Sequence, residues 1–98
     1  MNIKDLEFGN VVKLRDGTLC LICPDIYSSL KKIYDYLVIY PIDMICLRSI
    51  INGNLKTDLS NYNYDLSSMA GDDDIIEVYK DYTLQELLWK RGEKSNFD

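Results

Sequence analysis

The sequence has no histidine, and it has only five glycines and two prolines in 98 residues. Without histidine, a serine or cysteine nucleophile lacks its usual general base, and the commonest ligand of transition metals is missing. The glycines are scattered, so no glycine-rich loop is present to hold a phosphate group. These absences argue against the common nucleophilic, metal-dependent and nucleotide-dependent enzymes, and we expect that the protein is not an enzyme.

Long apolar runs are also missing. No stretch approaches the roughly 20 apolar residues that a membrane-spanning helix needs. The most apolar region, residues 37–51, is interrupted by Pro41, Asp43 and Arg48. The N-terminal stretch MNIKDLEFGN lacks the apolar core of a signal peptide. We therefore expect a cytoplasmic protein that makes no contact with a membrane.

Positive charge is scarce. The chain has 16 acidic and 11 basic residues, and its net charge is −5. Binding to nucleic acid requires clustered Lys and Arg side chains, and the basic residues are scattered, so we expect no direct nucleic-acid partner. The apolar content of 47% is sufficient for a folded core. The length predicts a single domain over residues 1–98, with residues 93–98 as a frayed tail.

The three cysteines do not match a metal site. Cys20 and Cys23 have a C-x-x-C spacing, which occurs in zinc and thiol redox sites. A four-cysteine zinc site needs a second pair, and only Cys46 remains. In a strand, moreover, residues three apart point to opposite faces. We interpret the cysteines as small buried or half-buried apolar residues, and expect no metal and no cofactor.

The stretch VVKLRDGTLCLIC predicts a β-hairpin that turns at Asp16-Gly17, a residue pair that tolerates positive φ. A two-residue loop pairs Leu14 with Leu19 and places Cys20 opposite Lys13. In this register one face carries four apolar side chains, which we expect to point inward: Val12, Leu14, Leu19 and Leu21.

Further strands are predicted at residues 34–42, 44–51 and 75–79, which are rich in β-branched and aromatic residues. Pro24 is expected to end the second strand of the hairpin. Asn52-Gly53-Asn54 is expected to close the strand before it. The polar region between residues 55 and 73 is expected to contain a short strand and turns.

The stretch YTLQELLWKRG predicts a helix over residues 83–91. Thr83 and Glu86 have the spacing of a capping box, and Gly92 is a typical stop. Leu84, Leu87 and Leu88 fall on one helical stripe and are expected to be buried on the sheet. The sequence thus predicts a mostly β fold with a C-terminal helix (α+β), built on a small, bent antiparallel sheet or barrel.

Four stretches follow one another in the order VVKLRDGTLCLIC, LSNYNYDL, DIIEVYK and LLWKR. They resemble a group of small proteins encoded by phages and prophages of low-GC Gram-positive bacteria. Those proteins commonly carry GDVVKLRNG, YNxDL, DIVKVY and LWxR at the corresponding places. The resemblance covers most of the chain, less well residues 24–50. It implies an SH3-like small barrel that acts in the cytoplasm of a host cell. The group has no established activity, so the resemblance transfers no functional residue.

Three consecutive carboxylates precede the strand at residues 75–79. A calcium loop spaces its acidic residues at alternate positions, so we interpret this run as an exposed, solvated turn. With Glu77 and nearby tyrosines it could instead form an acidic patch for a basic partner. Tyr62 and Tyr64 lie in a polar segment where a core role is less obvious, and tyrosine is common at interfaces. The candidate partner-binding residues are Tyr62, Tyr64, Asp72, Asp73, Asp74 and Glu77.

Two functions from different classes fit these observations. The first is an accessory protein that binds a host protein with a basic surface, such as a nucleic-acid-handling enzyme. Inhibition of a host defence nuclease, as by an anti-CRISPR protein, would be one form of it. The second is a structural or adaptor SH3-like barrel that can form homo-oligomers and inhibits nothing. A hydrolase or metal-dependent enzyme is the class that the sequence supports least.

Overall fold

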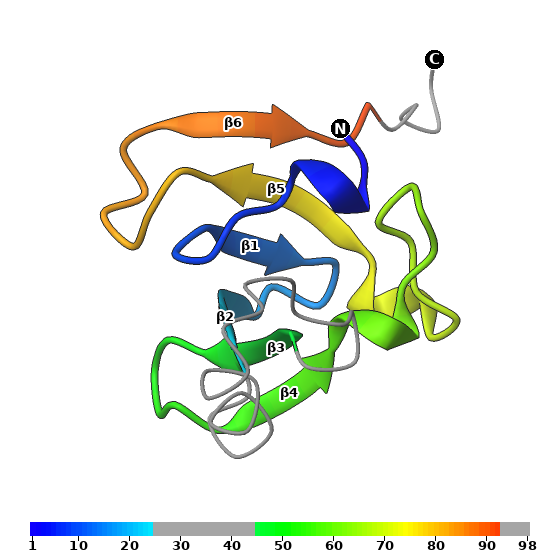
Figure 1. The fold of residues 1–98 in the computed structure, drawn as a ribbon, viewed down its shortest axis with the longest axis horizontal. Helices are drawn as coiled ribbons and strands as arrows, with labels where there is room; N and C mark the ends of the chain where they lie inside the picture. The colour runs from blue at the N-terminus through cyan, green and yellow to red at the C-terminus, as the bar shows by residue number, and fades with distance from the viewer. Residues whose placement is uncertain (25–44, 93–98) are drawn as a thin grey trace, which may run out of the picture.

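The computed structural model describes residues 1–24 and 45–92, and within them six strands form one antiparallel sheet (Figure 1). The strands lie in the order β4-β3-β2-β1-β5-β6. Their bounds are Val11–Leu14 (β1), Leu19–Pro24 (β2), Ile45–Ser49 (β3), Leu55–Asp58 (β4), Ile75–Tyr79 (β5) and Leu87–Lys90 (β6). The described residues also contain three short 3-10 helices, Ile3–Asp5 (η1), Leu59–Asn61 (η3) and Gly71–Asp73 (η4). The chain leaves β4 at one edge of the sheet and passes through η3 and η4 before β5 pairs with β1.

The prediction of a mostly β protein is confirmed. The strand predicted at residues 75–79 is β5, with the same bounds, and the strand predicted at residues 44–51 contains β3. Gly53, with a φ of +73°, turns the chain from β3 into β4, the short strand expected in the polar region. The predicted strand at residues 34–42 and the predicted tail at residues 93–98 lie outside the described residues.

The hairpin is confirmed at the predicted place, but its register is wrong by one residue. Lys13 pairs with Leu19, and Val12 pairs with Cys20. The loop has three residues, because the Leu14 N–H donates to the Thr18 carbonyl at 2.9 Å. Gly17 is its last residue, with a φ of +92°, which is the usual way to close a three-residue hairpin loop.

The shift in register changes which side chains point inward. Val12 and Leu14 are buried as predicted, but Leu19 and Leu21 are only half-buried. Cys20 and Ile22 take their place in the core. The small size and apolar character of a thiol allow Cys20 to fill this position.

The predicted C-terminal helix is wrong, because residues 87–90 form the edge strand β6. Asp81 accepts the Thr83 N–H at 2.9 Å, so Thr83 lies in a turn and caps no helix. Leu84 has a φ of +60°, which no right-handed helix accommodates. Leu87 and Leu88, predicted to be buried, are exposed. Pairing with β5 satisfies the backbone groups on one side of β6 and outweighs the local helical pattern.

The core lies on one face of the sheet, under the segment that joins β4 to β5. The cluster comprises Val12, Leu14, Cys20, Ile22, Leu47, Leu59, Tyr62, Leu66, Ile75 and Val78. Ile3, Leu6, Ile45 and Trp89 pack at its margin. In the described residues the edge strands β4 and β6 do not pair with each other. The same residues contain no helix that is long and apolar enough to cross a membrane.

Replacement of Gly17 tests the loop. Because Gly17 has a φ of +92°, Gly17→Val should lower the free energy of unfolding by about 1–3 kcal/mol. Gly71 is the matched control, since it lacks a positive φ and has open space around it, so Gly71→Ala should change stability by less than about 0.5 kcal/mol. Urea denaturation measures both. Equal effects of the two substitutions would contradict this description of the loop.

Candidate interaction surface

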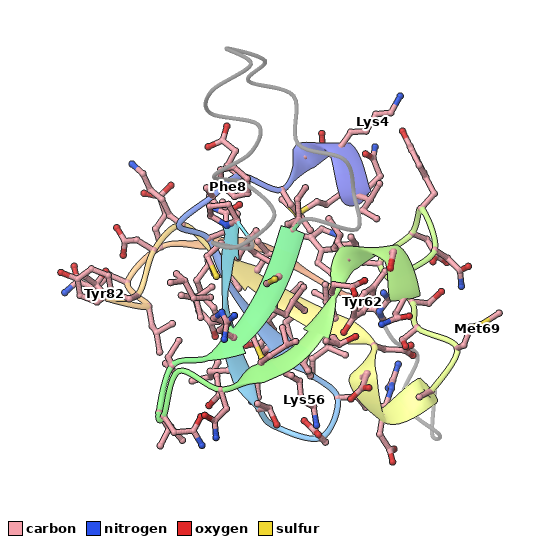
Figure 2. All side chains as sticks on the ribbon, turned by 60° about the horizontal axis from the view of Figure 1, so that its bottom comes forward. Lys4, Phe8, Lys56, Tyr62, Met69 and Tyr82 are labelled. Atoms are coloured by element: carbon pink, nitrogen blue, oxygen red, sulfur yellow. The ribbon has the colours of Figure 1, made fainter. Side chains whose placement is uncertain are left out.

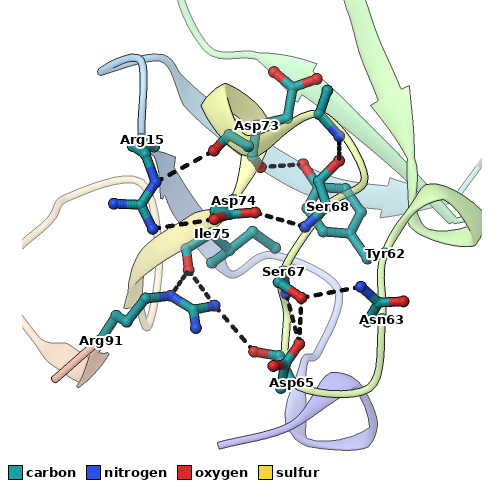
Figure 3. A network of polar contacts seen from close by, with 12 residues as sticks. Arg15, Tyr62, Asn63, Asp65, Ser67, Ser68, Asp73, Asp74, Ile75 and Arg91 are labelled. Carbon is teal, nitrogen blue, oxygen red and sulfur yellow. Dashed lines mark hydrogen bonds and ion pairs between the residues drawn. The ribbon is translucent and has the colours of Figure 1, made fainter. Parts of the chain in front are cut away.

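The three consecutive acids, residues 72–74, which we call the acidic turn, end η4 and directly precede β5, and they lie against the β1–β2 loop (Figure 3). The Arg15 N–H donates to the Asp74 carbonyl at 2.8 Å, and the Asp16 N–H donates to the Asp72 carbonyl at 3.0 Å. The turn is therefore tied to the hairpin by its backbone. Of the three acids only Asp72 is exposed; Asp73 and Asp74 are half-buried.

Asp74 is the most constrained of the three. Its carboxylate accepts the Arg15 guanidinium at 3.0 Å and the Ser68 N–H at 2.7 Å. The Arg15 Nε also donates to the Gly71 carbonyl at 3.2 Å. The Asp74 side chain is only 15% exposed, so this ion pair is better shielded than an ordinary surface pair. The prediction that the acids form a solvated turn is therefore wrong for Asp74.

Lys56 compensates the negative charge of two acids, Asp16 and Asp73. Its ammonium lies 3.2 Å from the Asp16 carboxylate and 3.7 Å from that of Asp73. Hydrogen bonds from the Thr18 backbone and hydroxyl, with Lys56 beside them, lower the pKa of Asp16. The hydrogen bond to the Asp16 carboxylate and the negative charge of that carboxylate raise the pKa of Lys56. Two of the three consecutive acids thus have a cation nearby, although the sequence shows none next to the run.

Tyr62, a candidate contact residue, is a core residue. It is 7% exposed, and its hydroxyl donates to the Asp73 carbonyl at 2.7 Å. Burial, with the Asp73 carboxylate nearby, raises the pKa of Tyr62. The expectation that Tyr62 had no obvious core role is wrong, because its ring fills the core while its hydroxyl holds the acidic turn. Its side chain cannot offer a contact surface.

Residues 62–70, which we call the display loop, present the other candidate tyrosine. Leu66 is fully buried with a φ of +72°, a rare conformation for a leucine. It anchors the loop, since its carbonyl accepts the Ile75 N–H at 3.1 Å. Tyr64 is 57% exposed and Met69 is 95% exposed. Figure 2 shows Met69 pointing away from the molecule. The loop is thus fixed at its base and displays two apolar side chains to solvent.

Glu77 does not join the acidic turn. It lies on β5, where it pairs with Lys13 on one side and Lys90 on the other. Its carboxylate is 3.9 Å from the Lys90 ammonium and accepts a hydrogen bond from Tyr79, which raises the pKa of that tyrosine. The structure therefore brings together Tyr62, Asp73 and Asp74, leaves Asp72 and Tyr64 exposed, and places Glu77 apart.

Arg91 is a structural residue that sequence reasoning missed. Its guanidinium donates to the Ile75 carbonyl and, at 3.0 Å, to the Asp65 carbonyl (Figure 3). It also lies over the Trp89 ring, 5.3 Å from the centroid. Arg91 thus links β6 to the display loop. The only sign of Arg91 in the sequence was its place in the LWxR motif, and that motif does not indicate which groups Arg91 contacts.

The described residues offer few other features that could bind a metal ion or a small molecule. Within residues 1–24 and 45–92, no group of three or more Cys, Asp or Glu side chains could hold a metal ion. A shallow depression lies beside the display loop and is lined by Thr57, Asn61, Ser68, Met69, Ala70 and Asp73.

Comparison with known proteins found no matching family model, no matching curated protein and no matching solved structure. The resemblance to small phage and prophage proteins therefore stays a prediction.

The acidic turn can be tested one residue at a time. Asp74→Asn removes a shielded ion pair with Arg15 and should lower the free energy of unfolding by about 1–2 kcal/mol. Asp72→Asn changes an exposed carboxylate with the same chemistry and should stay within about 0.5 kcal/mol. Urea denaturation of the two variants gives the comparison. If both variants are as stable as the wild type, Arg15 does not hold the turn.

Asp16 gives a pH test. Its pKa is below the ordinary value of 3.8, so its ionised form stabilises the fold above pH 3.8. That contribution is lost as the pH falls through the lowered pKa. Asp16→Asn should therefore be less stable than the wild type at pH 7, and the difference should shrink below about pH 3.5. Denaturation at several pH values measures this; a constant difference down to pH 2 would contradict it.

Proposed function

We propose that this protein is a small accessory protein that acts by binding another protein. The observation that carries the proposal is the display loop, which is anchored in the core at Tyr62 and Leu66 and exposes Tyr64 and Met69. Loops that carry contact residues are commonly held by a rigid scaffold. Tyrosine and methionine are both enriched in the buried centres of interfaces. A loop that needed only solubility would place polar side chains at these positions.

Charge supports a partner with a basic surface. The exposed acids closest to Tyr64 and Met69 in the chain are Asp65 and Asp72. The sequence has no Lys or Arg between residues 57 and 79, and the chain carries a net charge of −5. The fold brings Arg15, Lys56 and Arg91 to this region, where they contact Asp74, Asp73 and the Asp65 carbonyl. An acidic rim around apolar contacts steers a basic partner towards the surface and mainly raises the association rate. Enzymes that handle nucleic acid have such basic surfaces.

The phage-like motifs and the lack of histidine extend the proposal. They support an SH3-like barrel that acts in the cytoplasm of a host cell, without catalysis. In that setting a nucleic-acid-handling enzyme of host defence is a suitable partner, and the protein would inhibit it as an anti-CRISPR protein does. Direct binding to nucleic acid or to a membrane is not part of this proposal.

Among the residues that the structure describes, β6 has no strand beyond it, and this edge favours a second candidate function, a self-associating adaptor. Leu87 and Leu88 are exposed there, and an unpaired edge with apolar side chains can add a strand from another chain. Lys90 and the bulge opposite Tyr79 act against such pairing, because charge and irregular twist both protect an edge. We therefore rank this candidate second.

The experiment is a pull-down from the lysate of a low-GC Gram-positive bacterium, followed by kinetics with the purified prey. The display-loop variant Tyr64→Ala with Met69→Ala should bind the prey at least about tenfold more weakly, because it removes the exposed apolar contacts. Its stability should remain close to that of the wild type, since both side chains are exposed.

Tyr82→Ala is the matched control. Tyr82 is also an exposed tyrosine, and Figure 2 shows it on the opposite side of the molecule from Met69. This variant should bind like the wild type. Equal loss in both variants, or no loss in either, would rule out the display loop as the contact surface. Self-association with no prey would favour the adaptor.

A separate variant tests whether the exposed acids raise the association rate. Asp65→Asn with Asp72→Asn should slow association with the basic prey and flatten its dependence on salt, with little change in dissociation. These two acids are suitable because both side chains are exposed, whereas Asp74 holds the fold. An unchanged association rate and salt slope would remove the electrostatic part of the proposal.

A further inference from the structure

Two of the three cysteines face each other across neighbouring strands. Cys23 on β2 and Cys46 on β3 are direct partners in the antiparallel register. Cys20, the other half of the C-x-x-C spacing, pairs with Val12 on β1, and its side chain lies in the core on the opposite face of the sheet. The cysteine opposite Cys23 is therefore Cys46, and Cys20 points to the other face of the sheet, as expected for residues three apart in a strand.

The backbone hydrogen bonds of β2 show whether Cys23 and Cys46 form a hydrogen-bonded or a non-hydrogen-bonded pair. The Ile22 N–H donates to the Asn10 carbonyl, and the Ile22 carbonyl accepts the Gly9 N–H, both at 2.9 Å. The backbone groups of Ile22 thus face towards β1, and those of Cys23 face β3. Cys23 and Cys46 therefore form a hydrogen-bonded pair, in which the Cα atoms are about 5.5 Å apart.

This separation permits a disulfide. Disulfides join Cα atoms about 4.4–6.8 Å apart, so the backbone of the pair is already within range. The Cβ atoms of such a pair are up to about 5.5 Å apart, whereas a relaxed disulfide brings them to about 3.8 Å. The strands must move slightly closer, so the bond would carry strain. A strained disulfide is more easily reduced than a structural one.

The two thiols differ in access. The three cysteines are all thiols; Cys23 is half-buried, and Cys46 is 2% exposed. A reagent from solution therefore reaches Cys23 first. Cys46 is then the neighbour that can complete the exchange without reaching solvent itself.

We propose that Cys23 and Cys46 are a redox-sensitive pair that forms a reversible cross-strand disulfide with a low-molecular-weight disulfide as oxidant. The Cys23 thiolate attacks one sulfur of the oxidant, whose S–S bond breaks, and one small thiol leaves with the proton that Cys23 gave up. The Cys46 thiolate then attacks the Cys23 sulfur, and the second small thiol leaves with the Cys46 proton. Two protein thiols are oxidised, and one small disulfide is reduced to two thiols.

The bond would join the ends of a long connection. Residues 24–45 lie between the two cysteines in the sequence, so the disulfide closes a ring that contains the whole segment from β2 to β3. Closing such a ring restricts the unfolded chain and favours the folded one. Oxidation should therefore raise the melting temperature, and reduction should reverse the change.

The test uses the folded full chain and oxidised glutathione. Intact mass should fall by two hydrogen atoms, and peptide mapping without reduction should link Cys23 to Cys46. The melting temperature should rise by several degrees, and reduced glutathione at millimolar concentration should restore the thiols. Cys20 should remain a thiol that is alkylated only after unfolding, because it is fully buried.

Three variants separate the steps. Cys46→Ser should stop the reaction at a glutathione adduct on Cys23, and Cys23→Ser should prevent any reaction of the folded protein. Cys20→Ser is the control and should still give the Cys23–Cys46 link. Mapping of the wild type gives an answer even if a variant does not fold. A Cys20–Cys23 link, a lasting adduct on the wild type, or no oxidation would each overturn the proposal.

Discussion

The tie between the β1–β2 loop and the acidic turn is the contact on which the rest of the structure depends. Arg15 makes it twice, through its N–H to the Asp74 carbonyl and through its guanidinium to the Asp74 carboxylate. β5 begins at the next residue, so this tie determines where Ile75 enters the core beside β1. The display loop is anchored to the same place, because Tyr62 donates to the carbonyl of Asp73 and Leu66 accepts from Ile75. One partly shielded ion pair thus positions a strand, part of the core and the proposed contact surface.

This arrangement separates structural acids from acids that remain available to a partner. Asp74 is held by Arg15, whereas Asp65, within the display loop, and Asp72, two residues after its end, remain exposed. In the complex that we propose, the exposed acids would attract a basic partner, and Tyr64 and Met69 would supply the apolar contact. The exposed acids could thus attract a partner while the ion pair between Arg15 and Asp74 stays intact. The cysteine pair between β2 and β3 is a separate feature.

Much of the fold follows from the sequence, and the errors have identifiable physical causes. β5 was predicted from its β-branched and aromatic residues, and the first hairpin from its apolar alternation and the Asp16-Gly17 turn, all of which are local signals. The hairpin register was wrong because Gly17 also closes a three-residue loop. The cysteines are buried or half-buried as expected, but the two-residue loop had placed Cys20 on the face opposite to Val12 and Leu14. Residues 87–90 were predicted as helix because the capping-box spacing and the leucine stripe are local helix signals, whereas residues 80–86 carry no hairpin signal that would indicate the pairing of β6 with β5. The ion pairs of the acidic turn were missed because Lys56 and Arg15 are remote in sequence from Asp73 and Asp74.

The most direct test of the central claim, that Arg15 holds the acidic turn in place, is a double-mutant cycle between Arg15→Met and Asp74→Asn. Methionine keeps much of the length of the arginine side chain, so the cycle reports mainly on the charged contact. Unfolding free energies from urea denaturation should give a coupling energy of about 1 kcal/mol, because the carboxylate is partly buried and also accepts the Ser68 N–H. A coupling energy near zero, with purely additive effects, would contradict the claim.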